Sequence, residues 1–144
     1  TGHEFFYENY KVKQIQSLKG LLKKLIKIYK INYKNVLGHS DVSPSRKKDP
    51  GEKFPWKNLS KLKLAQWHNL SEKELKKYRL IKLSSKDENN FLNNLYKIGY
   101  SKIKPSKSRN NKRFLAKSFQ RRFRQNLVNG VIDKECLLIS RDLF

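Results

Sequence analysis

The sequence is poor in cysteine, in acidic residues and in long apolar runs, and each shortage excludes a class of protein. Cys136 is the single cysteine among 144 residues, which excludes an internal disulfide and a cysteine-based zinc finger and leaves helix packing as its expected role. No segment approaches the roughly 18 continuous apolar residues that a membrane-spanning helix needs. The chain opens at Thr1 without a methionine and without a charged segment followed by an apolar signal core. We therefore expect an N-terminal part to be missing from this sequence.

Acidic residues are outnumbered, because 12 Asp and Glu face 34 Lys and Arg, which gives a formal net charge of +22. Such a charge attracts polyanions, and nucleic acid, anionic lipid and acidic cell-wall polymers all qualify. Much of the excess is lysine accompanied by asparagine and isoleucine, a composition that the coding bias of an AT-rich genome also produces. Charge by itself therefore does not choose a partner.

Apolar residues spaced by three and four predict an amphipathic helix over residues 11–30, with lysines on its other face. Residues 36–39 (VLGH) predict a short buried strand that ends at His39, in the helix-then-strand order of α/β layers. Prolines keep the following loop irregular. A short helix is expected from Trp56 to Leu64.

Helical spacing dominates the second half of the chain. Ser85 and Glu88 form a capping box for a helix that Gly99 ends. A second helix is predicted through Phe114 to Phe123, and Asp133 is expected to cap a third. The fold class predicted is therefore α/β, a mixed sheet with helices over residues 1–67, followed by a connector over 68–84 and a small all-α three-helix module over 85–144.

The stretch from Val36 to Trp56, VLGHSDVSPSRKKDPGEKFPW, contains residues that suit a metal site. A hydrolytic zinc site needs imidazole or carboxylate ligands, usually three from the protein, and one open position. His39 and Asp49 supply two such groups ten positions apart. On spacing alone, a hydrogen-bonded histidine and an ordinary turn aspartate remain the more common alternative.

The same stretch closely resembles the signature of the type-2 N-acetylmuramoyl-L-alanine amidases, zinc hydrolases that cut between N-acetylmuramic acid and L-alanine in peptidoglycan. That signature runs Gly-His-Ser-Asp, two residues, Pro, one residue, Arg-Lys, one residue, Asp-Pro-Gly, then an aromatic residue and Trp, and every position is matched. The resemblance implies Zn²⁺ as the cofactor, His39 and Asp49 as two of its three ligands, and Lys47 as the catalytic residue over the open position. There its ammonium would stabilise the oxyanion that develops on the amide.

The resemblance also implies what lies elsewhere. The family's first ligand histidine and its general-base glutamate would both precede Thr1, so residues 1–67 would be the C-terminal part of a truncated catalytic domain. His3 and Glu4 match neither residue, and His68 is expected on the polar surface. We therefore expect little or no amidase activity from this chain alone. An inactive relic of such an enzyme is an alternative.

Supporting roles are expected for other residues of this stretch. Asp41 and Arg46 should fix the loop rather than touch substrate, while Phe54 and Trp56 should anchor its far end.

Residues 85–144 resemble, less sharply, the three-helix peptidoglycan-binding domain found behind such amidases. The resemblance rests on FLNNLYKIGY, FLAKSFQRRFRQ and VNGVIDKECL, with Asn129 and Cys136 where the family commonly has Asp and Thr. It implies peptidoglycan or muropeptides as the partner and a bacterial cell-envelope location that is periplasmic or outer-membrane-associated. The sequence leaves the oligomeric state open, and a monomer is expected. A wall-binding fragment is one alternative. A basic nucleic-acid-binding protein is another, because SKSRNNKR and QRRFRQ place basic residues near aromatics, although no nucleic-acid motif of fixed spacing is present.

Overall fold

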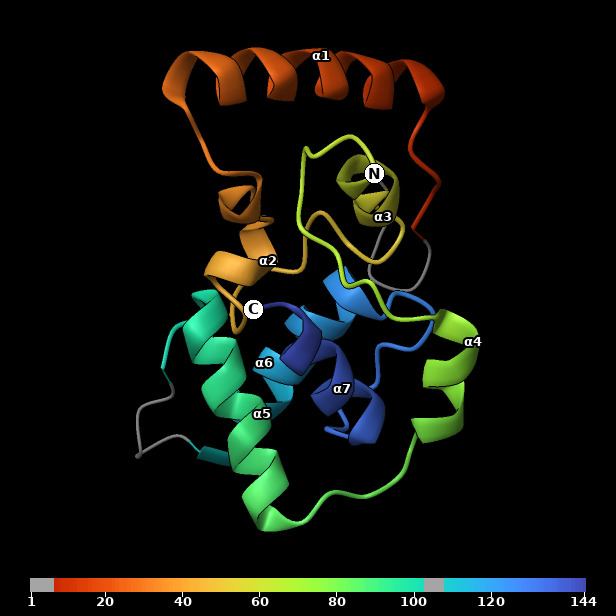
Figure 1. Ribbon diagram of the computed structural model, residues 1–144, viewed down its shortest axis with the longest axis vertical. Helices are drawn as coiled ribbons and strands as arrows, with labels where there is room; N and C mark the ends of the chain where they lie inside the picture. Colours follow the sequence, from red (N-terminus) through yellow and green to blue (C-terminus); the bar gives the residue numbers. More distant parts are fainter. Residues whose placement is uncertain (1–6, 103–107) are drawn as a thin grey trace.

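The computed structural model describes residues 7–102 and 108–144, and the regular elements in these ranges are helical. Figure 1 shows α1 lying across one end, with α5, α6 and α7 gathered toward the other end. None of the helices within the described ranges is long and apolar enough to cross a membrane. In chain order the elements are α1 (Val12–Tyr29), η1 (Tyr33–Asn35), α2 (His39–Val42), α3 (Trp56–Ser60), α4 (Glu72–Leu75), η2 (Lys76–Tyr78), α5 (Ser85–Ile98), α6 (Ser108–Phe123) and α7 (Lys134–Asp142).

The predicted α/β fold with a mixed sheet is wrong for the described residues, where β pairing is limited to one isolated antiparallel bridge between Lys82 and Asp133. Val36 and Gly38 have extended backbones, but His39 begins helix α2 instead of ending a strand. Side chains take the backbone groups that a sheet would pair. Arg122 donates to the carbonyl oxygen of Val36, and the Asp41 carboxylate accepts from the amide of Gly38. Because side chains satisfy these two groups, they need no neighbouring strand as a partner.

Helix α1 confirms the amphipathic helix predicted over residues 11–30. Leu18, Leu22 and Ile26 recur every four residues and pack against a small core of Trp56, Leu59, Leu64 and Ala65. No residue of α1 is fully buried, so a single stripe of side chains holds this helix against the rest of the protein.

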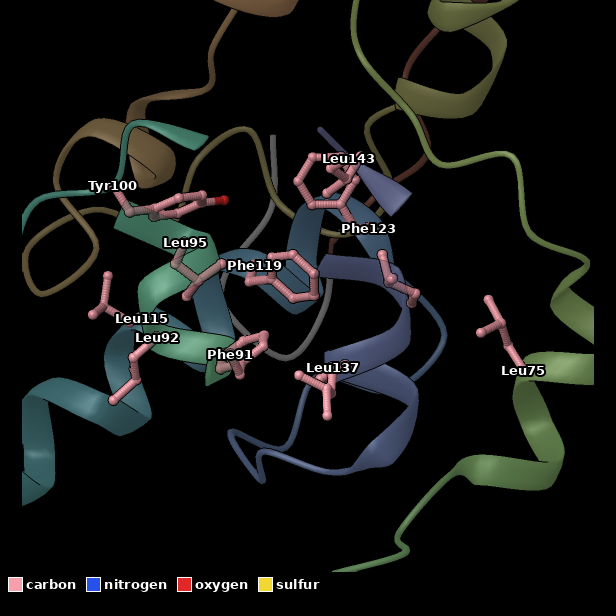
Figure 2. Close-up of a cluster of buried hydrophobic side chains, with 12 residues drawn as sticks. Leu75, Phe91, Leu92, Leu95, Tyr100, Leu115, Phe119, Phe123, Leu137 and Leu143 are labelled. Atoms are coloured by element: carbon pink, nitrogen blue, oxygen red, sulfur yellow. The ribbon is translucent and has the colours of Figure 1, made fainter. Parts of the chain in front are cut away.

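The larger core lies between α5, α6 and α7, as predicted for the second half (Figure 2). Phe91 of α5 meets Phe119 of α6 edge to face, with ring centroids 5.1 Å apart. Cys136 of α7 is fully buried in this core, which raises the pKa of its thiol to about 12. Trp67 packs against both cores and so joins them.

The helix ends show which local signals were correct. The N-cap of α5 is Ser84, whose hydroxyl accepts from the amide of Asp87 at 3.1 Å, so the predicted capping box of Ser85 and Glu88 is wrong by one residue. Gly99 ends α5 with a positive φ of 115°, as predicted. Asp133 caps α7 by accepting from the amide of Cys136 at 3.0 Å, also as predicted.

Substituting Asp133→Asn should lower the free energy of unfolding at neutral pH by about 3 kcal/mol, because the buried Arg124 guanidinium would lose a charged partner. Burial alone raises the pKa of Asp133, but the bonds from the Cys136 amide and Arg124 outweigh it and bring the pKa below its usual 3.8. Such a carboxylate stabilises the fold fully above its unfolded pKa and ceases to do so as pH falls through its folded pKa.

Urea unfolding at pH 7 and pH 3 measures this difference. Wild type should lose more stability than Asp133→Asn on acidification, since the variant has no carboxylate to protonate at this position. Equal losses in the two proteins would contradict the role of Asp133.

Candidate metal centre

The predicted pair His39 and Asp49 meets at the surface. His39 is the first residue of α2, and Asp49 immediately precedes Pro50. The Nδ1 atom of His39 lies 3.1 Å from Oδ2 of Asp49, and the two side chains are 51% and 64% exposed. A backbone bond closes the loop beside them, because the amide of Ser40 donates to the carbonyl of Asp49 at 2.9 Å. The fold therefore brings together two groups ten residues apart and leaves them open to solvent.

The spacing of the two donor atoms suits a shared tetrahedral ion. Nitrogen and oxygen ligands lie about 2.0–2.1 Å from zinc, so two ligands on one tetrahedron are about 3.3 Å apart. The observed 3.1 Å is close to that value, although it is also an ordinary hydrogen-bond distance. Within residues 7–102 and 108–144, no three His, Cys, Asp or Glu residues gather closely enough to hold a metal. The described residues thus offer two donors rather than a complete ligand set.

Lys47 lies in the same loop, two residues before Asp49, and its side chain is exposed. Its amide donates to the carbonyl of Ser43 at 2.9 Å, and Nε of Arg46 donates to the hydroxyl of Ser43 at 3.0 Å. These bonds make a compact turn from Ser43 to Lys47, with Arg46 in the loop-fixing position expected of it. His3 and Glu4 lie outside the described residues.

Gly38 allows the loop to close tightly next to His39. A Cβ atom at this position would lie 2.7 Å from Cδ of Pro50 and 3.1 Å from Cζ2 of Trp56. The backbone at Gly38 therefore packs directly on the residue that follows Asp49. This contact explains physically why glycine precedes the histidine.

Asp41 is the buried centre of the loop, and only 5% of it is exposed. Its carboxylate accepts from the amide of Gly38 at 2.8 Å, from the Tyr100 hydroxyl at 2.8 Å and from Arg122 at 2.7 Å. Burial, and after it the charge of Asp41, raises the pKa of Tyr100 well above its usual value. The sequence indicated that Asp41 fixes the loop but gave no partner for it, since Arg122 is 81 positions away.

The far end of the loop is anchored as predicted. Trp56 is buried in the smaller core, and Phe54 packs against the same core with its ring centroid 4.6 Å from that of Trp56. The carbonyl of Phe54 accepts from the Gln125 amide group, and the Tyr10 hydroxyl donates to the carbonyl of Pro50, each at 2.6 Å. Both ends of the loop are therefore tied to other parts of the chain.

His68 was expected on the polar surface, and that expectation is wrong. It is only 5% exposed and stacks on Trp67, with ring centroids 5.0 Å apart. Both rings line a cavity of about 220 Å³ together with Arg79 and Glu135. Burial lowers the pKa of His68, which favours the neutral ring. The missed signal was its position beside a tryptophan at the junction of the two cores.

Known proteins to which this chain is similar are amidases, as the resemblance of its motif implies. Residues 2–52 match the family described as N-acetylmuramoyl-L-alanine amidase. The N-acetylmuramoyl-L-alanine amidase AmiD of Escherichia coli strain K12 is 31% identical over 138 residues, which are 96% of this chain and 50% of AmiD. The 1,6-anhydro-N-acetylmuramyl-L-alanine amidase AmpD of the same strain is 44% identical over 43 residues, which are 30% of this chain and 24% of AmpD.

Solved structures of two such amidases are also similar to this chain. The complex of AmiD with its substrate anhydro-N-acetylmuramic acid-L-Ala-D-gamma-Glu-L-Lys is similar at a TM-score of 0.82 and 31% identity, covering 96% of this chain and 53% of that one. AmpDh3 from Pseudomonas aeruginosa is similar at a TM-score of 0.79 and 29% identity, covering 96% and 54%. The chain is thus similar to these amidases over nearly its whole length, and it spans about half the length of AmiD and of AmpDh3.

The close packing at Gly38 generates a stability prediction. Gly38→Ala should lower the free energy of unfolding by about 1–3 kcal/mol, because the new methyl group overlaps Pro50 in a packed loop. Gly20→Ala is the matched control, since its Cβ in the middle of α1 would meet nothing within 4 Å. That control should gain up to about 1 kcal/mol from helix propensity. Urea unfolding measures both changes in the free energy of unfolding. A Gly38→Ala protein that is as stable as the parent, or more stable, would contradict this packing.

Proposed function

We propose that this homologue of the N-acetylmuramoyl-L-alanine amidases carries part of a zinc-dependent active site that cleaves the amide between N-acetylmuramic acid and L-alanine in peptidoglycan. The observation that supports this most directly is the approach of His39 Nδ1 to Asp49 Oδ2 at 3.1 Å, within a stretch that resembles the family signature at every position. Both side chains are exposed, so an ion and a substrate would have access to them.

Each residue of the proposed site has a chemical role. His39 and Asp49 would hold the ion, and zinc bound there would act as a Lewis acid toward the scissile amide. Lys47 would place a positive charge near the carbonyl oxygen of the substrate, where negative charge develops during hydrolysis. Among residues 7–102 and 108–144, no third ligand joins His39 and Asp49. Because two donors are fewer than a zinc site usually has, we expect this chain to bind zinc weakly and to hydrolyse little substrate.

The helical half is proposed to bind the wall polymer. A groove of about 510 Å³ runs along α5 and is lined by Asn90, Asn93, Asn94, Tyr96, Lys97, Lys102 and Arg141, with no carboxylate among them. Amide groups pair well with sugar hydroxyl and acetamido groups, and the cations suit the free carboxylates of stem peptides. A peptidoglycan or muropeptide partner would place the protein in the bacterial cell envelope.

The residues of QRRFRQ give little support to the nucleic-acid alternative, because most of them are buried. Arg122 and Arg124 are each only 3% exposed and form ion pairs with Asp41 and with Asp133 and Glu135. Phe123 between them is buried in the larger core. These side chains are therefore not free to contact phosphates or to stack on bases.

Zinc titration of the labelled chain, followed by NMR, tests the proposed ligands. The imidazole resonances of His39 should shift and saturate. His39→Ala or Asp49→Ala should weaken the apparent affinity at least about tenfold, since each removes one of two donors. Glu74→Gln is the control, because this exposed carboxylate pairs with Lys77 on the surface and should leave the titration unchanged. Zinc-dependent shifts at His3 or His68 with none at His39 would refute the assignment.

Co-sedimentation with insoluble peptidoglycan tests the proposed groove. Asn93→Ala combined with Lys97→Ala should reduce affinity about tenfold, which corresponds to the loss of about 1.4 kcal/mol of contacts. Lys86→Ala combined with Asn89→Ala removes the same residue types from α5 outside the groove and should bind normally. Retention on DNA with no sedimentation on peptidoglycan would overturn this part of the proposal.

A further inference from the structure

The loop that carries His39 and Asp49 is fastened to the helical half by buried side chains. Arg122 of α6 donates to Asp41 at 2.7 Å and to the carbonyl of Val36 at 3.0 Å, so it holds residues on both sides of His39. Tyr100, which follows α5, donates to the other carboxylate oxygen of Asp41 at 2.8 Å. The side chains of Arg122 and Asp41 are only 4% and 3% exposed. Solvent therefore does not compete for these bonds.

A second line of bonds leads from α6 to Asp49. The hydroxyl of Ser118 donates to the carbonyl of Ser40 at 2.7 Å, and the amide of Ser40 donates to the carbonyl of Asp49 at 2.9 Å. Ser118 is fully buried, so its hydroxyl has a fixed environment. Ser40, the residue after His39, is thus held by α6 through its carbonyl and holds Asp49 through its amide.

We infer that the helical half is part of the metal centre, with Arg122, Tyr100 and Ser118 as positioning residues that hold His39 and Asp49 in register. This inference rests on the proposed zinc-binding role of His39 and Asp49 and deepens it. Their hydrogen bonds to the loop are with the groups beside His39 and Asp49. They act through Asp41, Val36 and Ser40, the groups next to the two ligands.

The exposure of the two proposed ligands explains why such support is needed. His39 and the segment Ser45–Asp49 are exposed, and α2 is only four residues long, so neither burial nor a long helix fixes the two ligands. The guanidinium of Arg122 lies 4.4 Å from the ring centroid of Trp56, which itself packs against Gly38. Arg122 therefore joins the loop's carboxylate, its backbone and its aromatic anchor in one place. Lysine at this position would offer one ammonium group where arginine offers a planar fork.

Hydrogen exchange of the metal-free chain tests the positioning directly. Ser118→Ala should speed exchange of the Ser40 amide at least about tenfold, because Ser40, whose amide binds Asp49, loses the bond that ties its carbonyl to α6. Core amides of Phe91 and Leu95 should stay protected. Ser140→Ala is the matched control, since Ser140 is an equally buried serine whose hydroxyl donates to Leu137 within α7. It should leave the Ser40 amide unchanged.

Two further variants guard against loss of folding. Tyr100→Phe removes one hydroxyl and should speed exchange of the Gly38 amide, which donates to the same carboxylate. Arg122→Lys should speed exchange at both Gly38 and Ser40. Arg124→Lys disturbs a comparable buried pair that does not touch the loop, and it should not produce this pattern. Unchanged loop exchange in folded Ser118→Ala, Tyr100→Phe and Arg122→Lys proteins would overturn the inference.

Zinc titration separates this inference from the proposed function. If the parent chain binds zinc through His39, Ser118→Ala and Arg122→Lys should weaken that affinity about tenfold while His39 resonances still shift at saturation. Zinc binding at His39 that is unaffected by these variants would refute the positioning role and leave the ligand assignment intact. If the variants exchange faster in the loop but the parent chain binds no zinc at His39, the ligand assignment is refuted instead.

Discussion

The contact on which the rest of this structure depends is the buried ion pair between Asp41 and Arg122. A carboxylate removed from water is costly unless donors surround it, and Asp41 has three, from Gly38, Tyr100 and Arg122. The donors come from the loop itself, from the end of α5 and from α6. Because one carboxylate needs all of them, the loop can be buried at Asp41 only when the helical half is in place. The parts predicted over residues 1–67 and 85–144 are therefore joined through this carboxylate.

Three of the 12 acidic residues of this basic chain lie in its interior. Asp41, Asp133 and Glu135 are all buried, and each is paired with arginine rather than lysine. The planar fork of arginine satisfies several acceptors at once, as Arg79 does with both oxygens of Glu135. Lysines, in contrast, remain largely at the surface, where their ammonium groups stay hydrated. The excess charge is therefore a property of the surface, while the interior is close to balanced.

Local signals predicted the helices well and the remaining structure poorly. Periodic apolar residues located α1, α5 and α6, and Asp133 and Gly99 marked ends that the structure confirms. The cap of α5 was misplaced because Ser84 and Ser85 are each followed three positions later by an acidic residue, so the pattern allows both starts. The predicted strand failed because Val36 and Gly38 are satisfied by side chains, one of them 86 positions away. Long-range polar contacts of this kind leave no periodicity in the sequence.

The meeting of His39 and Asp49 was anticipated from the resemblance, since their spacing alone fits an ordinary turn equally well. The roles of these two residues and of Lys47 therefore remain proposals that a metal-bound structure would test most directly. Crystals of the full chain grown with zinc, measured on both sides of the zinc absorption edge, should show one anomalous peak between His39 Nδ1 and Asp49 Oδ2, within about 2.0–2.2 Å of each. Zinc held elsewhere, with the His39 and Asp49 side chains turned apart, would contradict the account.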